Sequence, residues 1–104
     1  MGREETRTIE ESGSQTREIV HEPPLYQVVL LNDDYTTMDF VIHVLETVFH
    51  KAPAEAMRIM LHVHKNGKGM CGLFPMEIAE MKVSAVHALA REHRFPLKCV
   101  MEKE

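Results

Sequence analysis

The chain contains no long hydrophobic run. No stretch of its 104 residues approaches the roughly 18 apolar residues that a membrane span needs. The N-terminus is charged and polar, without the apolar stretch of about 7–15 residues found in a secretory signal. We therefore expect a soluble, unexported, cytoplasmic protein with no membrane partner. Hydrophobic residues make up 44% of the chain and no exposed apolar patch is evident, so one folded domain and a monomer are expected.

Cysteine and positive charge are also scarce. The two cysteines, Cys71 and Cys99, lie far apart without Cys-x-x-Cys spacing. This favours buried thiols in a reducing compartment over a zinc site, with a cross-strand disulfide as the less favoured alternative. The net charge is −4, and no segment has the basic character that phosphate-backbone binding needs, so no nucleic-acid partner is expected. The seven histidines lack zinc spacing, and we predict neither a metal nor a cofactor.

Residues 1–24 differ in composition from the rest of the chain. They are rich in Glu, Arg, Ser and Thr, and they show no hydrophobic periodicity. Such a segment buries too little apolar surface to offset the entropy lost on ordering, so a flexible N-terminal tail is predicted. Pro23 and Pro24 hold the chain extended before the first strand. The folded domain is expected to comprise residues 25–104.

Six elements are predicted after the tail. Periodicity and end signals indicate a strand at 26–31, helices at 38–50 and 53–66, a strand at 69–74, a helix at 75–94 and a strand at 97–102. Thr36 or Thr37 is the expected N-cap of the first helix. The order β-α-α-β-α-β predicts an α+β fold, a small α/β sandwich with three helices on one face of a three-stranded, mainly antiparallel sheet.

A polar segment, Asn32-Asp33-Asp34-Tyr35-Thr36, separates the first strand from the first helix. On the residue pattern alone, a turn with a helix cap is the favoured interpretation, and apolar helical positions such as Met60 and Val63 would be core residues. If the helix faces meet this segment, however, they form a pocket that suits a cation with an apolar body. Its rim would be Asn32, Asp34, Thr36 and His64, and its walls Leu30, Met38, Val41, Met60 and Val63.

An ordered set of motifs spans residues 25–103: Asn32-Asp33-Asp34-Tyr35-Thr36, Met38, Phe40, Met60-Leu61, Val63-His64, Cys71-Gly72, Glu77, Glu80, Lys82, Pro96-Leu97 and Cys99. Together these residues resemble the ClpS family, adaptors of the ClpA unfoldase and the ClpP protease. The resemblance implies a protein without enzymatic activity that binds N-degrons, substrates whose first residue is Leu, Phe, Tyr or Trp. It implies that these substrates are delivered to ClpA for degradation by ClpAP.

The resemblance also assigns roles to residues. Asn32, Asp34 and His64 would bind the substrate's free α-amine, and Asp33 would support the start of the peptide. The first side chain would enter a pocket formed by Leu30, Thr36, Met38, Val41, Met60, Val63 and Leu97, with Met60 excluding β-branched Ile and Val. Tyr35, Glu77 and Lys82 would contact the ClpA N-terminal domain. Thr37 departs from the family, because many members have Pro there with its fixed φ angle.

Two other function classes stay open. A hydrolase could use His64 with Asp33 or Asp34 for acid-base chemistry, although the sequence offers no nucleophile elbow and no glycine-rich phosphate loop. A ribosome-associated module is the other alternative, because the C-terminal domain of the ribosomal stalk has a similar small α/β build. That alternative depends on fold analogy alone.

Overall fold

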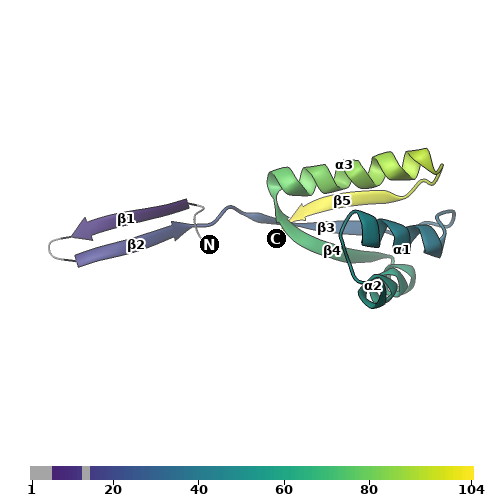
Figure 1. Cartoon of the computed structure of the whole chain (residues 1–104), viewed down its shortest axis with the longest axis horizontal. Coiled ribbons are helices and arrows are strands. Elements are labelled where there is room, and N and C mark those ends of the chain that lie inside the picture. The colour runs from purple at the N-terminus through teal and green to yellow at the C-terminus, as the bar shows by residue number, and fades with distance from the viewer. Residues whose placement is uncertain (1–5, 13–14) are drawn as a thin grey trace.

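The computed structural model describes residues 6–12 and 15–104, with side chains from residue 22 onward (Figure 1). In this part of the chain, β1 (Thr6–Ser12) and β2 (Gln15–His21) form a two-stranded antiparallel sheet. A second sheet has the order β4-β3-β5 and contains β3 (Leu25–Leu31), β4 (Lys68–Pro75) and β5 (Lys98–Lys103). The helices are α1 (Met38–Thr47), α2 (Pro53–Asn66) and α3 (Met76–Glu92).

The predicted α+β fold is confirmed from β3 onward. The elements follow the order β-α-α-β-α-β, and β3 pairs antiparallel with both β4 and β5. Val28 and Leu30, which share one face of β3, lie in the same buried cluster as residues of all three helices. The helices therefore cover one face of the sheet, as expected.

The helix ends follow local sequence signals. Pro53 occupies the first turn of α2, and Gly67 ends that helix in the left-handed region with φ 88°. The first helix ends at Thr47, three residues before the predicted end at His50. His50 itself has φ 56°, a left-handed conformation that cannot continue a helix.

The N-terminal segment differs from the expected tail without regular structure. The strands β1 and β2 pair from Thr6 opposite His21 to Ser12 opposite Gln15. Their sequences contain Thr, Ile and Val, which favour strands over the disorder that the overall polarity suggested. Figure 1 shows this hairpin extending away from the rest of the chain. The division at residue 24 and the flexibility of the segment stay predictions.

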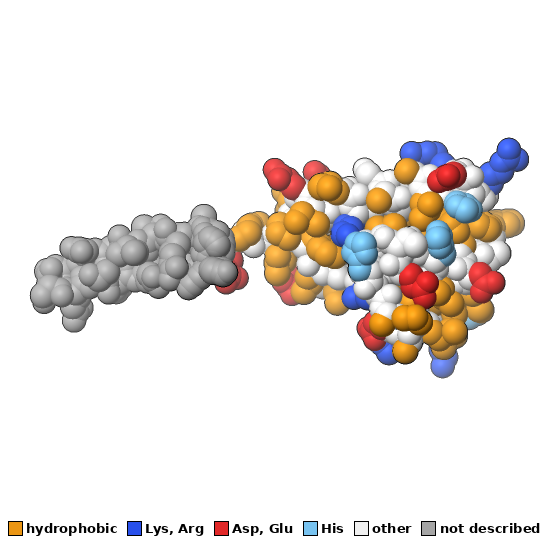
Figure 2. All heavy atoms as spheres, viewed as in Figure 1, with side chains coloured by type: hydrophobic (Ala, Val, Ile, Leu, Met, Phe, Trp, Pro, Cys, Tyr) orange, Lys and Arg blue, Asp and Glu red, His pale blue; other side chains and the backbone are white. Residues whose placement is uncertain are grey.

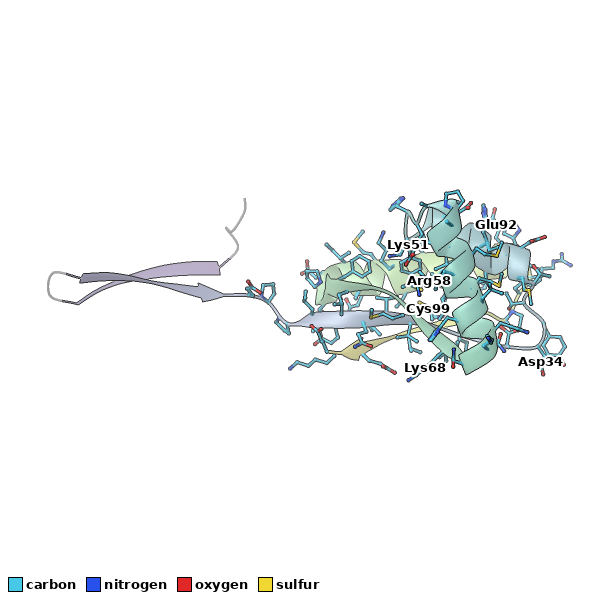
Figure 3. The ribbon with its side chains drawn as sticks, turned by 90° about the horizontal axis from the view of Figure 1, so that it is seen from below. Asp34, Lys51, Arg58, Lys68, Glu92 and Cys99 are labelled. Carbon is cyan, nitrogen blue, oxygen red and sulfur yellow. The ribbon has the colours of Figure 1, made fainter. Side chains whose placement is uncertain are left out.

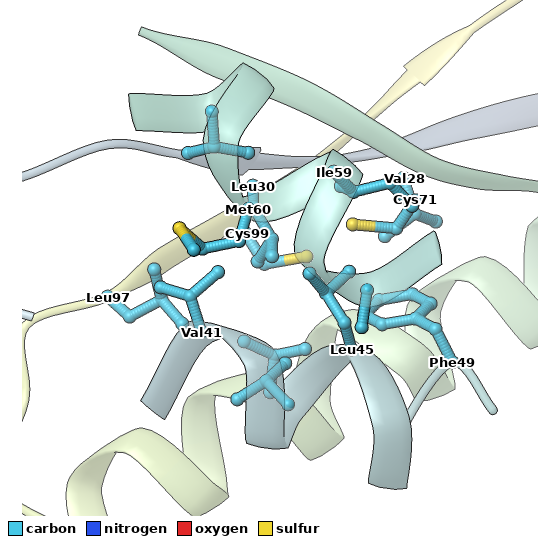
Figure 4. Close-up of a cluster of buried hydrophobic side chains, with 14 of the residues drawn as sticks. Val28, Leu30, Val41, Leu45, Phe49, Ile59, Met60, Cys71, Leu97 and Cys99 are labelled. Carbon is cyan, nitrogen blue, oxygen red and sulfur yellow. The ribbon is translucent and has the colours of Figure 1, made fainter. Parts of the chain in front are cut away.

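The core lies between the sheet and the helices (Figure 4). Its fully buried side chains come from all three strands of this sheet and all three helices, and include Leu30, Leu45, Val63 and Val86. Cys71 and Cys99 are free and buried, as the sequence indicated. Burial raises the pKa of each thiol to about 12, so both stay protonated and unreactive at neutral pH.

The surface is less uniformly polar than the sequence indicated. Large apolar side chains are exposed where β4 ends and α3 begins, namely Leu73, Met76, Ile78 and Met81. Hydrophobic side chains also gather at this end of the domain in Figure 2. The expectation that no apolar patch is exposed was therefore wrong.

In the described part of the chain, none of the helices combines the length and hydropathy that a membrane crossing requires.

Candidate ligand-binding site

A cavity of about 320 Å³ opens between the β3–α1 loop and helix α2. It is lined by Asn32, Asp33, Asp34, Thr36, Thr37, Met38, Val41, Met60, Val63 and His64. Ligand sites typically enclose about 300–1,000 Å³, so this one is small. It suits a single large side chain with an attached polar group better than an extended ligand.

The structure brings the residues predicted to bind the ligand to this cavity with two exceptions. Leu30 and Leu97 do not line it, because they are 0% and 3% exposed within the core. Figure 4 shows Leu97 beside Val41, and Leu30 close to Met60. These two residues therefore support the apolar wall from behind, since Leu30 of β3 and Leu97, the residue before β5, both pack in the core.

The cavity is polar at its rim and apolar at its floor. Asn32, Asp34 and His64 are exposed at the rim. The two methionines differ in depth, since Met38 is 44% exposed and Met60 only 4%. Met60 therefore belongs to the floor, whereas Met38 lies at the mouth.

Asp33 has a different role from Asp34. One carboxylate oxygen of Asp33 accepts from the backbone N–H groups of Tyr35 and Thr36, both at 2.8 Å, and the other accepts from the Thr36 hydroxyl at 2.6 Å. Partial burial raises the pKa of Asp33, but the hydrogen bonds from Thr36 and Tyr35 outweigh it, so the pKa is lowered overall. Asp33 thus shapes the loop as well as lining the cavity. The sequence analysis assigned Asp33 to the start of the peptide and did not predict that its carboxylate also holds the loop.

Asp34 is the carboxylate with spare acceptors. Among the described residues, no hydrogen bond or ion pair involves its side chain, although it lines the cavity. His64 likewise makes no hydrogen bond to a carboxylate in this part of the chain, so the acid-base pair of the hydrolase alternative is not formed here. No cluster of three or more potential metal ligands occurs in the same residues. The rim is therefore arranged to accept hydrogen bonds from a ligand.

Thr37, where the resemblance led us to expect proline, is the N-cap of α1. Its hydroxyl accepts from the Phe40 N–H at 3.1 Å, and its φ is −75°, within the range that proline imposes. An N-cap of this kind contributes about 1 kcal/mol to helix stability. The structure thus selects Thr37 over Thr36 as the cap and shows how the loop enters α1 without a proline.

The three residues assigned to unfoldase binding are not brought together. Figure 3 places Asp34, the neighbour of Tyr35, at one end of the domain, whereas α3, with Glu77 in its first turn, begins at the other end in Figure 1. Lys82 donates to the Val48 carbonyl at 2.7 Å, and its Nζ lies 5.9 and 5.6 Å from the ring centroids of Phe49 and Phe74. Lys82 therefore ties α3 to the end of α1.

A second hollow of about 480 Å³ lies across the same loop. Its lining includes Leu31, Tyr35, Pro96 and Lys98, and it shares Asn32, Asp33 and Asp34 with the first cavity. No helical side chain lines it, so it lacks the floor formed by Met60 and Val63. The smaller cavity is consequently the better candidate for binding an apolar group beside a cation.

The fold and the site define a small α+β protein with a pocket for a compact ligand. A family model described as "ATP-dependent Clp protease adaptor protein ClpS" matches residues 21–100. The ClpS adapter protein of Maricaulis maris is 55% identical over 91 residues, which cover 88% of this chain and 84% of that protein. The ClpS adapter protein of Desulforapulum autotrophicum is 61% identical over 82 residues, which cover 79% of each chain.

A solved structure is similar as well. Agrobacterium tumefaciens ClpS2 bound to L-phenylalaninamide matches with a TM-score of 0.77 and 38% identity, covering 80% of this chain and all of that one. The chain belongs to the ClpS family of Clp protease adaptor proteins. The family resemblance of the sequence is therefore confirmed, and the proteins of this family are adaptors of a protease.

Proposed function

We propose that this protein binds N-degrons, substrates with an N-terminal Leu, Phe, Tyr or Trp, and delivers them to the ClpA unfoldase of the ClpAP protease. The observation that carries the proposal is one cavity in which the Asp34 carboxylate, which has no partner among residues 22–104, lies beside the apolar floor of Met60 and Val63. The related ClpS2 was solved with an amide of phenylalanine, which supports a ligand of this class.

The chemistry of the rim suits a free α-amine. An α-amino group has a pKa of about 7.7–8.0 and is largely cationic near neutral pH. The Asp34 carboxylate, the Asn32 amide oxygen and a neutral ring nitrogen of His64 can all accept from it. Burial of a Leu or Phe side chain on the floor adds about 1.5–3 kcal/mol. The site thus recognises both the α-amine and the side chain of the first residue, so a peptide with a blocked amine or a small first side chain should bind weakly.

Peptide titration tests the proposal. Labelled peptides that differ only at the first residue are titrated with the full chain and followed by fluorescence anisotropy. We expect saturable binding of free N-terminal Leu and Phe, and at least tenfold weaker binding of acetylated Leu and of free Gly. Equal binding of all four peptides would show that the cavity does not recognise an N-terminal residue.

Replacement of Met60 by Ala should relax discrimination against β-branched residues. Met60 is 4% exposed on the cavity floor, where its thioether leaves little room for a second branch at Cβ. Because an overpacked contact costs about 1–3 kcal/mol, the affinity for N-terminal Ile relative to Leu should rise about tenfold in Met60→Ala. Met57→Ala serves as a control, since Met57 is 47% exposed on the same helix and does not line the cavity. Unchanged discrimination against Ile in Met60→Ala would show that Met60 does not exclude β-branched residues.

Delivery is proposed to use other parts of the molecule. Contacts with the ClpA N-terminal domain are assigned to Tyr35, Glu77 and Lys82, and residues 1–24 would reach toward the unfoldase. The exposed Met76 and Ile78 on either side of Glu77 support an interface at the start of α3, because such apolar patches mark interaction sites. Since Lys82 also ties α3 to α1, its variants need a stability measurement beside any ClpA-binding assay. The adaptor would act as a monomer in the cytoplasm.

A further inference from the structure

Gly69 lies directly behind the apolar wall of the cavity. It is buried on β4, opposite Leu30 of β3. A Cβ atom at this position would lie 2.7 Å from Cγ2 of Val63 and 3.4 Å from Cδ2 of His62. Val63 is 2% exposed and lines the cavity with its neighbours on α2. A methyl group of Val63 therefore occupies the space that any side chain at position 69 would take.

The backbone does not require glycine here. Among the described glycines, only Gly67 has a positive φ, so an alanine at position 69 meets no conformational strain of that kind. The constraint at position 69 is one of space. A contact of 2.7 Å is shorter than any that real Cβ atoms make, so something must move when a methyl group is added.

We infer that Gly69 is a specificity-determining residue, which sets the width of the cavity by letting Val63 lie back against β4. The inference depends on the proposed recognition of an N-terminal side chain. On β3, the residue paired with Gly69 is Leu30, which is 0% exposed, so the sheet leaves no free space on that side of Gly69. Because protein interiors are close-packed, Val63 gives way toward unfilled volume, and the cavity that its side chain lines supplies it. A larger residue at position 69 therefore narrows the cavity without touching the ligand.

The variant Gly69→Ala should separate large first residues from smaller ones. We expect the ratio of affinities for N-terminal Phe and Leu to fall about tenfold, because the broad aromatic ring needs the width that the displaced Val63 removes. N-terminal Trp should lose more than Phe. Leu should retain an affinity within about threefold of that of the wild type.

Two further variants make the test specific. In Gly72→Ala the new Cβ would lie 2.8 Å from the Phe74 ring, a comparable clash on the same strand, but neither Gly72 nor Phe74 lines the cavity. It should lower the melting temperature and leave the Phe-to-Leu ratio unchanged. The double variant Gly69→Ala/Val63→Ala removes the methyl group that clashes, and should restore the Phe-to-Leu ratio to within about threefold of that of the wild type. Because it lacks the clash, it gives a result even if the single variant does not fold.

The outcomes are distinct. A Phe-to-Leu ratio that is unchanged in folded Gly69→Ala, that falls equally in Gly72→Ala, or that stays low in the double variant would overturn the role of Gly69. A wild-type protein that binds neither free Leu nor free Phe would instead overturn the proposed function, and this is measured first with the same peptides.

Discussion

Replacement of Asp34 by Ala should weaken binding of a free N-terminal Leu peptide about 10- to 150-fold. The reason is that a hydrogen bond to a charged group contributes about 1.5–3 kcal/mol, and each 1.4 kcal/mol is a factor of ten in affinity. Asp34 lines the cavity and has no partner among the described residues, so its removal costs the fold little. Fluorescence anisotropy measures the affinity, and thermal unfolding should show a melting temperature close to that of the wild type.

Acetylation of the peptide provides the decisive comparison. If Asp34 binds the amine, acetylation removes the same interaction as the substitution, and the two losses should not add. The acetylated peptide should then bind wild type and Asp34→Ala almost equally. A loss of equal size for free and acetylated peptides would show that Asp34 acts on something other than the amine.

The control for Asp34 is Asp39. Asp39 lies in the first turn of α1, close in sequence and exposed, but it does not line the cavity. Asp39→Ala removes the same charge and should change peptide affinity less than threefold, although the helix loses a small favourable interaction with its N-terminus. This variant separates direct binding from the general negative potential of the surface.

The fold from β3 onward was predictable because each of its elements carries its own signal. Pro53 marks the start of α2 and Gly67 its end, in the sequence as in the structure. The period-2 pattern of β3 places Val28 and Leu30 on the same face, and the structure shows that this face lies in the core. The end of α1 was not predictable in the same way. The apolar stripe continues through Phe49, although α1 ends at Thr47. The backbone turn that follows, in which His50 has a left-handed φ, has no signal in the sequence.

The site was predictable in its composition and not in its internal contacts. The sequence placed Met60 and Val63 beside the polar loop, and the structure agrees. It could not show that Leu97 lies behind the wall, because the position of Leu97 beside Val41 of α1 depends on the packed fold (Figure 4). Nor could it show that Lys82 turns inward to the Val48 carbonyl, since a lysine on an amphipathic helix is usually solvated.

Replacement of Asp33 by Ala should have an equally large effect on binding by a different route. The substitution removes the acceptors of three hydrogen bonds and leaves the N–H groups of Tyr35 and Thr36 without their partner. The loop that carries Asp34 then loses its fixed shape, and we expect at least a 30-fold loss of affinity for free N-terminal Leu. Unlike Asp34→Ala, this variant should also show faster hydrogen exchange at the amides of residues 35 and 36.

The amide variant separates shape from charge. Asparagine keeps an oxygen that accepts from both backbone N–H groups, as it does in turns, and its NH₂ group can donate to the Thr36 hydroxyl. Asp33→Asn should therefore retain affinity within about tenfold of that of the wild type. If both variants lose affinity equally, the negative charge of Asp33 contacts the ligand directly, and its assignment as the residue that shapes the loop is wrong.

Acid titration compares the loop of the wild type with that of Asp33→Asn in the absence of a ligand. The pKa of Asp33 is lowered in the folded protein, so its stabilisation of the loop is fully present above the ordinary carboxyl pKa of about 3.9. It is lost as the pH falls through the lower value of the folded state, because the protonated carboxyl no longer accepts all three hydrogen bonds. Nuclear magnetic resonance should detect this loss at residues 35 and 36 in the wild type below pH 3.9. The response at these two residues should be smaller in Asp33→Asn than in the wild type, because the side chain that holds the loop no longer changes its protonation.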